Sequence, residues 1–295
     1  MDRIGKYVVH KVVLTTGYAR IFLCHDPDLQ VPVAVKVFDP RAGIAGPLSP
    51  AQLLARFTVE ARSLASFDHP YIVSVKAMEH LDDGRPYFVM PFQAAHLSYE
   101  IGKDFADADA PERDQPRKVA LPRALGLVKQ LASALNALHR RGMVHRAVMP
   151  SNILLTAKEG GVVKLADFSM VKLPERNPPL PDHWIGGTEY CAPEQRENAT
   201  GVGPQADVYS LGVLAYRLVT GGLPDTTIGA VELPDGPAEL AELIRACTDP
   251  DPARRPAHGG AVLEAVAGVP VPAARKPVQV VTLKKPMPKP VKATA

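Results

Sequence analysis

The stretch MVHRAVMPSNILL, residues 143–155, holds residue types whose order usually serves phosphate chemistry. A His-Arg pair, His145 and Arg146, is followed by a proline, an asparagine and an apolar run. The residue directly after Arg146 is Ala147, however, and a methyl group can accept no proton. The sequence therefore describes either a catalytic loop that lacks its proton acceptor or an accidental likeness to such a loop.

A second pair of charged residues lies upstream. Lys36 lies in the apolar run VAVKVF, where alternation places Ala34 and Lys36 on one face of a strand and the valines on the other. A lysine in so apolar a strand needs an anion. Glu60 lies on the face of the next predicted helix that should meet the sheet, where an unpaired carboxylate would be costly. We therefore expect Lys36 and Glu60 to form an ion pair; the alternative for each is an ordinary surface charge.

Both groups depend on elements that the sequence pattern predicts. Runs rich in β-branched and aromatic residues indicate strands at about 7–14, 19–26, 31–39, 72–80 and 86–92. Apolar residues at helical spacing indicate helices at about 50–64, 122–141, 205–220 and 237–248. Strands that come first and helices that come later predict an α+β fold in two segregated parts.

The first predicted helix has a clear start and a clear inner face. Ser49 can cap it, and Pro50 suits the first helical position, where its missing N–H is no loss. The residues at helical spacing that should face the sheet are Leu53, Leu54, Phe57, Ala61 and Leu64.

Composition excludes several classes of protein. The 295 residues are 46% hydrophobic, enough for one large two-lobed domain or two ordinary ones. No apolar run reaches the ~18 residues of a membrane span, and the N-terminus lacks the apolar core of a signal peptide. The 34 basic and 31 acidic residues are too balanced to imply nucleic acid as the main partner. Three cysteines without metal-binding spacing indicate reduced thiols inside the cell.

Seven motifs, in order, make the chain similar to the eukaryotic-type protein kinases, and most closely to the bacterial Ser/Thr branch. They are VAVK, RFTVEARSLASFDHPYIV, LHRRGMVHRAVMPSNILL, VVKLADFSM, GGTEYCAPEQ, ADVYSLGVLAYRLVTGGLP and DPDPARRP. They resemble the phosphate-binding lysine strand, the helix with its Glu partner, the catalytic loop, the DFG segment, the APE segment, the central helix of the second lobe and a late arginine signature. The resemblance covers residues 7 to about 268.

The resemblance implies a bilobal fold with three parts. A β-rich N-lobe with one main helix is expected over about 1–92, and a mostly helical C-lobe over about 93–268. The remaining residues, 269–295, are rich in proline and lysine and contain no acidic residue. They are expected to form a tail or linker that cannot fold alone and that could contact an acidic partner or an anionic surface.

The resemblance also implies a set of site residues. The nucleotide would be ATP, held by Leu14, Gly17, Ile21, Ala34, Lys36, Glu60, Met90 and Leu154. Mg²⁺ or Mn²⁺ would be held by Asn152 and Asp167. Glu194 and Arg255 would tie the activation segment to the C-lobe, Asp207 would anchor the backbone of the catalytic loop, and His145 would pack beneath Phe168. For the apolar members of the nucleotide set, ordinary core packing is the alternative.

The chain departs from the family pattern at the reacting positions. The family aspartate that accepts the proton of the attacking hydroxyl is replaced by Ala147, and the family lysine two positions later by Met149. The scaffold residues His145 and Arg146 remain. In an ungapped match the three glycines of the phosphate loop fall on Leu14, Thr16 and Ala19, so side chains should hold this loop farther from a phosphate.

The activation segment departs as well. Ser169 replaces the DFG glycine, and Thr188 matches a structural threonine of the family, but no loop threonine remains that could be phosphorylated and pair with Arg146. Prolines favour a fixed extended path instead, at positions 174, 178, 179 and 181.

These observations predict a pseudokinase that binds ATP weakly or not at all. It would act as a regulatory or scaffolding partner of another protein, such as an active kinase or its substrate, with no nucleic acid and no membrane span. A cytoplasmic chain is expected, or else the cytoplasmic part of a longer membrane-anchored protein. The alternatives are a slow but active Ser/Thr kinase, because phosphoryl transfer rests mainly on positioning and charge, and a nucleotide-free scaffold.

Overall fold

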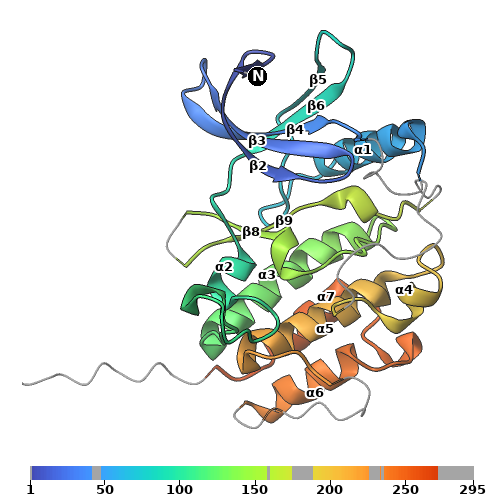
Figure 1. Ribbon diagram of the computed structural model, residues 1–295. Helices are drawn as coiled ribbons and strands as arrows, with labels where there is room; N and C mark the ends of the chain where they lie inside the picture. Colours follow the sequence, from blue (N-terminus) through green and yellow to red (C-terminus); the bar gives the residue numbers. More distant parts are fainter. Residues whose placement is uncertain are drawn as a thin grey trace, which may run out of the picture.

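Strands and helices separate along the chain as the sequence pattern predicts (Figure 1). The computed structural model describes residues 2–41, 48–157, 160–174, 189–225, 233 and 236–271. The predictions for most of the activation segment, including Thr188 and three of its four prolines, and for the tail from residue 272 onward fall outside these ranges.

The upper part of the molecule is an antiparallel sheet with one long helix. The sheet has the order β1-β2-β3-β4-β6-β5. Its strands are β1 (Arg3–Ile4), β2 (Tyr7–Thr15), β3 (Ala19–Asp26), β4 (Val31–Phe38), β5 (Ala77–His80) and β6 (Pro86–Pro91). Alternation along β4 divides the side chains between two cores: Val33, Val35 and Val37 pack on one face, and Lys36 points from the other toward the helix.

The long helix α1 (Pro50–Ala65) begins as predicted. The Ser49 side chain accepts from the Gln52 amide, and the Gln52 side chain accepts from the Ser49 amide, which completes a capping box. Phe57 packs against the rings of Phe38 and Phe88 beneath the sheet. Leu54 was expected on this inner face but is 38% exposed. It lies one residue after the buried Leu53, and one step around a helix turns a side chain by about 100°.

The strand predicted at 72–80 is shorter than expected. Ile72 forms a bridge with Leu165, and the Val73 amide donates to the Leu165 carbonyl at 3.0 Å. Because these residues are bonded to the lower part of the molecule, only Ala77–His80 pairs with β6. The first half of this apolar run therefore connects the two lobes.

The lower part is mainly helical. Its helices are α2 (Leu97–Ile101), α3 (Leu121–His139), α4 (Pro193–Glu197), α5 (Pro204–Thr220), α6 (Ala238–Cys247) and α7 (Gly259–Ala267). Its 3₁₀ turns are Glu112–Asp114, Pro150–Asn152, Phe168–Met170 and Pro252–Arg254. A small sheet adds β7 (Ala95–His96), β8 (Ile153–Leu155) and β9 (Val163–Leu165).

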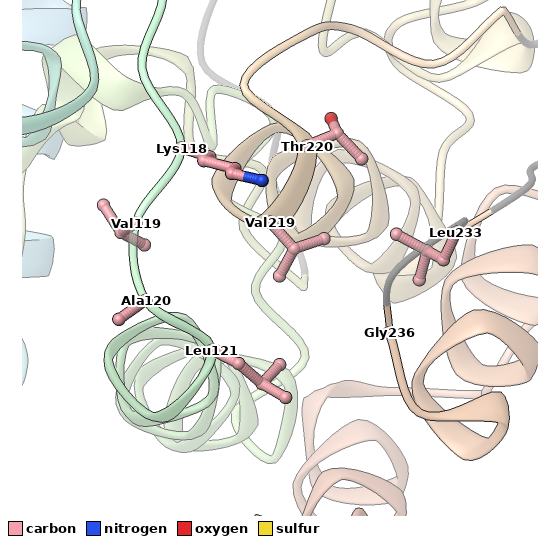
Figure 2. A pocket seen from close by; sticks show the side chains of 8 residues that line it. All are labelled: Lys118, Val119, Ala120, Leu121, Val219, Thr220, Leu233 and Gly236. Carbon is pink, nitrogen blue, oxygen red and sulfur yellow. The ribbon is translucent and has the colours of Figure 1, made fainter. Parts of the chain in front are cut away.

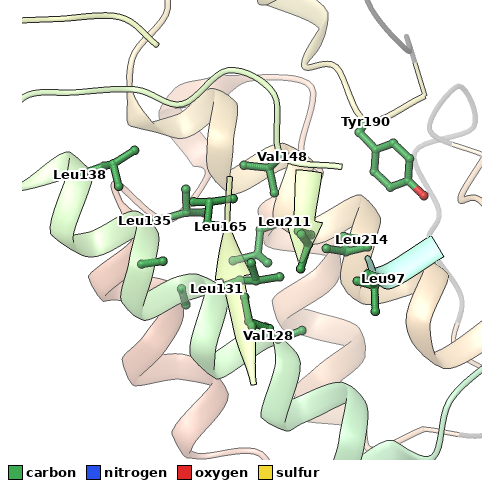
Figure 3. Packing of buried hydrophobic residues seen from close by; sticks show 14 of the residues in the cluster. Leu97, Val128, Leu131, Leu135, Leu138, Val148, Leu165, Tyr190, Leu211 and Leu214 are labelled. Carbon is green, nitrogen blue, oxygen red and sulfur yellow. The ribbon is translucent and has the colours of Figure 1, made fainter. Parts of the chain in front are cut away.

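The core of the lower part lies around α3 and α5. Figure 3 shows four side chains of α3 that pack toward β9 and α5, namely Val128, Leu131, Leu135 and Leu138. They meet Leu165 of β9 and Leu211 and Leu214 of α5. Gly221, with φ of 84°, ends α5 in a left-handed conformation, one residue after the predicted last residue of this helix. The three cysteines are free and buried.

The α7 helix was not predicted. It has only nine residues, too few for a clear period, and begins at two glycines. A Cβ on Gly259 would lie 2.6 Å from the Asn136 amide nitrogen, so α7 can approach α3 this closely only because residue 259 is a glycine.

The polar segment 103–119 lies at the surface but is firmly held. The buried Arg217 guanidinium donates to the carbonyls of Ile101, Lys103 and Arg117, which fixes both ends of the segment on α5. Beside it lies a cavity of about 330 Å³, away from the predicted site residues (Figure 2). Its lining comprises Lys118, Val119, Ala120, Leu121, Val219, Thr220, Leu233 and Gly236.

None of the helices in the described part of the chain has the length and apolar character that a bilayer crossing needs.

Candidate functional site

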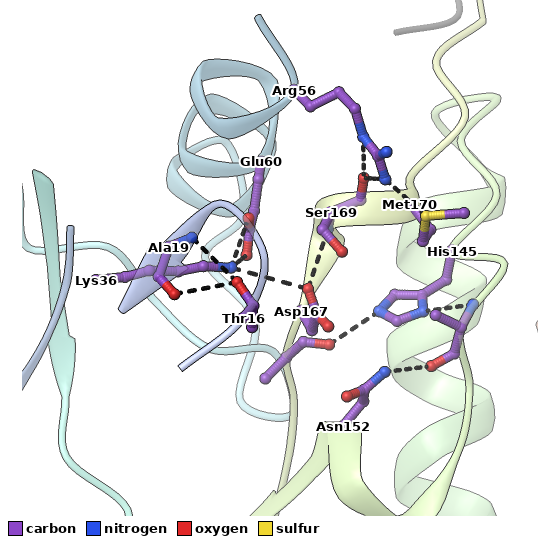
Figure 4. A network of polar contacts seen from close by, with 12 residues as sticks. Thr16, Ala19, Lys36, Arg56, Glu60, His145, Asn152, Asp167, Ser169 and Met170 are labelled. Carbon is purple, nitrogen blue, oxygen red and sulfur yellow. Dashed lines mark hydrogen bonds and ion pairs between the residues drawn. The ribbon is translucent and has the colours of Figure 1, made fainter. Parts of the chain in front are cut away.

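Lys36 and Glu60 form the ion pair that the sequence predicts (Figure 4). The Lys36 Nζ lies 2.7 Å from both carboxylate oxygens of Glu60, and the two residues are 5% and 2% exposed. Burial acts to lower the pKa of Lys36, but Glu60, Tyr18 and Asp167 together outweigh it and the pKa is raised. Lys36 is therefore a fixed positive charge at the back of the cleft between the two lobes.

Asp167 brings a carboxylate to the same place. Its Oδ1 lies 3.9 Å from the Lys36 Nζ and accepts from the Ser169 amide at 3.3 Å. Burial acts to raise the pKa of Asp167, but the charge of Lys36 and the bond from Ser169 outweigh it, so the pKa is lowered. The side chain is still 39% exposed, and it is therefore an ionised group open to the cleft.

Asn152 supplies a second oxygen. Its Nδ2 donates to the Ala147 carbonyl at 2.9 Å, which leaves Oδ1 as an acceptor. Within the described residues no cluster of three or more His, Cys, Asp or Glu side chains could hold a metal ion alone. Two hard oxygen donors fit Mg²⁺, which usually takes its other ligands from phosphates and water.

The inner side of the catalytic loop is anchored by Asp207, as predicted. Its two oxygens accept from the amides of His145 and Arg146 at 2.7 Å each. His139 accepts from the Gly259 amide at Nδ1, so its Nε2 carries the proton and donates to Asp207 at 2.9 Å. Burial acts to raise the pKa of Asp207, but the hydrogen bonds that it accepts, from His139 and from the His145 amide among others, favour the ionised form and the pKa is lowered.

His145 connects this loop to Phe168. The two rings meet edge to face with centroids 4.9 Å apart, and His145 Nε2 lies 3.1 Å from the Ala166 carbonyl. Burial lowers the pKa of His145, so the ring is neutral and Nε2 donates to that carbonyl. This is the packing beneath Phe168 that the resemblance implies.

The outer side of the loop carries the altered residues. Ala147 and Met149 are half-buried, whereas the residues on either side of them, Arg146, Val148 and Pro150, are buried. The Ala147 amide donates to His145 Nδ1, and its carbonyl accepts from Asn152, so the backbone at this position is fully bonded. Only the side-chain chemistry is missing.

Two arginines hold the segment that contains Ser169 and Met170. Arg56, which the sequence analysis missed, is 6% exposed and donates to the Ser169 carbonyl and to Met170 Sδ. Arg146 Nε donates to the Met170 carbonyl at 2.5 Å, and burial lowers the pKa of Arg146 to about 10. Arg56 precedes Glu60 by four residues, so helical spacing places it on the same face of α1, but this spacing does not identify its acceptors.

Glu194 and Arg255 form the predicted pair that ties α4 to the segment before α7. The two guanidinium nitrogens lie 2.7 and 2.9 Å from the carboxylate oxygens, and the Arg255 side chain is fully buried. Gln195, also missed by the sequence analysis, donates from Nε2 to the Arg146 carbonyl at 2.9 Å. The α4 helix is therefore connected directly to the catalytic loop.

The apolar residues predicted to hold a nucleotide lie in strands of both lobes. Ile21 pairs with Lys36 across β3 and β4, Ala34 pairs with Met90 across β4 and β6, and Leu154 lies in β8 below them. All four are half-buried, which fits the lining of a cleft better than a closed core. Leu14 is 51% exposed, and Gly17 lies in the turn between β2 and β3.

Comparison with known proteins agrees with this geometry. A family model described as protein kinase domain matches residues 7–264. The serine/threonine-protein kinase PknA of Mycobacterium tuberculosis is 32% identical over 281 residues, which cover 90% of this chain and 61% of PknA.

Two further relatives bear similar names. The serine/threonine-protein kinase PknL of Mycobacterium tuberculosis is 33% identical over 285 residues, covering 89% of this chain and 66% of PknL. The serine/threonine-protein kinase Pkn1 of Myxococcus xanthus is 33% identical over 227 residues, covering 75% of this chain and 30% of Pkn1. The chain thus spans less than two thirds of the length of each.

Proposed function

The chain belongs to the protein kinase family and has a kinase fold, and on that premise we propose that it is a pseudokinase, a regulatory or scaffolding partner in Ser/Thr kinase signalling. The observation that carries the proposal is Ala147. It lies where the family places its proton acceptor, in a loop whose backbone is otherwise fully bonded. A loop whose backbone is held in place but which has no catalytic base supports a role in binding a partner rather than in phosphoryl transfer.

The proposal includes a weak nucleotide site. Members of the family use ATP and Mg²⁺. Lys36 would contact the phosphates, Asn152 and Asp167 would hold the Mg²⁺ or Mn²⁺, and Ile21, Ala34, Met90 and Leu154 would enclose the adenine. The metal ion, when bound, would neutralise phosphate charge.

A second candidate function rests on the same side chains. Lys36 pairs with Glu60 and Asp167, and the Asn152 carbonyl accepts from the Ala166 amide next to Asp167, so a slow Ser/Thr protein kinase could still position ATP without a base. Ala147 and Met149 oppose this candidate. A scaffold that binds no nucleotide is the third candidate.

The proposed partner is a protein, such as an active kinase or its substrate. The proposed setting is the cytoplasm, either as a free chain or as the cytoplasmic part of a longer membrane-anchored protein. The basic segment 269–295 would contact an acidic partner or an anionic surface.

Two measurements separate the candidates. Transfer of radiolabelled γ-phosphate to a generic basic protein should be negligible in the wild type and equal to that of Asp167→Ala. Transfer that is robust in the wild type and lost in Asp167→Ala would establish the slow kinase instead.

The second measurement is thermal unfolding with ATP and Mg²⁺ or Mn²⁺. A ligand at ~100 times its Kd stabilises a fold by about 2.7 kcal/mol, so millimolar ATP should raise the melting temperature of the wild type. An unchanged melting temperature would favour the nucleotide-free scaffold.

A further inference from the structure

The turn between β2 and β3, residues 15–19, is closed by its own side chain. The Thr16 amide donates to the Ala19 carbonyl at 2.8 Å, and the Ala19 amide donates to Thr16 Oγ1 at 3.1 Å (Figure 4). In a phosphate-binding loop, amides of this kind point at the ligand. Here a threonine stands where the family has a glycine, and its hydroxyl already bonds the Ala19 amide.

The same turn is tied to the end of β4. The Asp39 amide donates to the Tyr18 carbonyl at 2.8 Å, and the Arg41 amide donates to the Gly17 carbonyl at 3.0 Å. The Arg41 Nη2 donates to the Thr16 carbonyl at 3.1 Å. Three successive carbonyls of the turn are thus bonded, and the turn cannot open toward a ligand without breaking these bonds.

Tyr18 projects from this turn toward the charged groups of the cleft. The Lys36 Nζ lies 5.8 Å from the centroid of the Tyr18 ring, within the range of a cation–π contact. Burial raises the pKa of the Tyr18 phenol to about 12, with Lys36 acting against the rise and Glu60 and Asp167 adding to it. The ring therefore lies beside the lysine and the aspartate that would meet the phosphates and the metal ion.

The adenine end of the cleft is built from other residues. Ile21, Ala34, Met90 and Leu154 are apolar and half-buried, and none of them belongs to the turn. These apolar side chains would suit a flat ring, whereas the Tyr18 ring lies beside Lys36 where the phosphates would bind.

We propose that this cleft selects an adenine nucleoside over ATP, with Thr16 and Tyr18 as the residues that set the selectivity. The inference rests on the proposed nucleotide site and specifies its ligand class. A nucleoside would bind the apolar end and leave the turn intact. A triphosphate would have to move the Tyr18 ring away from Lys36 and would gain no free amide from Ala19.

The test uses the full chain and two probes, adenosine and ATP with Mg²⁺, in titration calorimetry. The wild type should bind adenosine at least as tightly as ATP. Tyr18→Ala should tighten ATP binding by about tenfold and leave adenosine within about twofold, because only the phosphate end changes. Tyr18→Phe is the matched control; it keeps the ring and should behave like the wild type.

Thr16→Gly gives a second variant that keeps Tyr18 and frees the Ala19 amide, and it should also tighten ATP binding selectively. Thr16→Gly replaces Tyr18→Ala in the titrations if Tyr18→Ala is unfolded at the temperature of the measurement. A wild type that prefers ATP by about tenfold or more, with neither variant changing its affinity, would overturn this inference and leave the nucleotide site standing. If neither probe bound any variant, the nucleotide site itself would be wrong, and both proposals with it.

Discussion

The inner and outer sides of the catalytic loop differ in burial and in chemistry. On the inner side, His145 and Arg146 are buried and their amides are bonded to Asp207. On the outer side, Ala147 and Met149 are half-buried and carry neither a proton acceptor nor a charge. The fold depends on the first set, because a buried polar group without a partner is costly, whereas the reaction depends on the second. The fold of the loop can therefore be retained when the side chains needed for phosphoryl transfer are lost.

The largest expected effect comes from rebuilding the outer side. A positioned base contributes ~10²–10⁴-fold and one charge donor roughly 10²–10³-fold, and groups that act as a unit are not additive. The wild type should therefore be about 10³–10⁶-fold slower than an intact site. Ala147→Asp with Met149→Lys should raise single-turnover phosphoryl transfer only in part, because Leu14, Thr16 and Ala19 remain in the phosphate loop.

Glycines at those three positions should add a further gain that is larger in the rebuilt loop than in the wild type. Asp167→Ala in each background is the blank. A fully rebuilt protein that still transfers nothing would move the cause of inactivity from the outer side of the loop to the activation segment.

The next effect tests the inner side. Asp207→Ala leaves the amides of His145 and Arg146 and the His139 N–H without an acceptor. At about 1–3 kcal/mol for each buried donor, the free energy of unfolding should fall by roughly 3–9 kcal/mol in urea titrations. Asp207→Asn, which retains one oxygen, should lose less. A loss below ~1 kcal/mol for Asp207→Ala would show that the inner side does not hold the fold.

Lys36 and Glu60 extend the comparison to the other lobe. Removing one partner of a buried ion pair typically costs ~3–5 kcal/mol, so Lys36→Ala and Glu60→Ala should each destabilise the protein without any nucleotide. Lys36→Met combined with Glu60→Leu should recover most of that loss, because neither member of the buried pair is left without the other, and Asp167, which also loses Lys36, is 39% exposed. Single variants as stable as the wild type would mean that the pair serves the ligand alone.

The smallest effect is a pH dependence of the inner side. Because burial lowers the pKa of His145, the unfolded chain binds a proton there below pH ~6.5 while the folded protein does not. Stability should therefore fall as the pH drops from 7.5 to 5.5, by at most ~1.4 kcal/mol per pH unit for this group. His145→Gln should flatten the fall, and His80→Gln, at an exposed position, should not. Identical slopes for both variants would assign the fall to other groups, such as the partly buried His69.

The sequence predicted the helices that are long enough to show a repeating apolar pattern or that begin at a recognisable capping residue. The cap at Ser49, the first helical position at Pro50 and the range of α5 were predicted because local physics decides them. It failed where distant contacts decide. Residues 72–76 have strand composition, yet Ile72 and Val73 bond β9 instead. The strands β8 and β9 have three residues each, too few for any period to show.

The site residues also divide into those that local sequence patterns predict and those that depend on distant contacts. Lys36 and Glu60 could be paired from alternation and helical spacing, because each needed the other. Arg56 was missed because its acceptors are a backbone carbonyl and a sulfur more than a hundred residues away, and backbone atoms leave no mark in a sequence. The turn at Thr16 was expected to stand farther from a phosphate, but its self-closure depends on bonds that only coordinates show.

The hydrogen bonds from Arg56 and Arg146 to the Phe168–Met170 turn have a thermodynamic consequence. Both guanidinium groups bond this turn directly, so its order is acquired during folding and requires no covalent modification. Phe168 and Met170 are buried, so a protein that docked beside this turn would meet a surface whose conformational entropy had already been lost. The fraction of the protein with this partner bound would then depend only on the partner's concentration and affinity. No modification of the turn would be needed before binding.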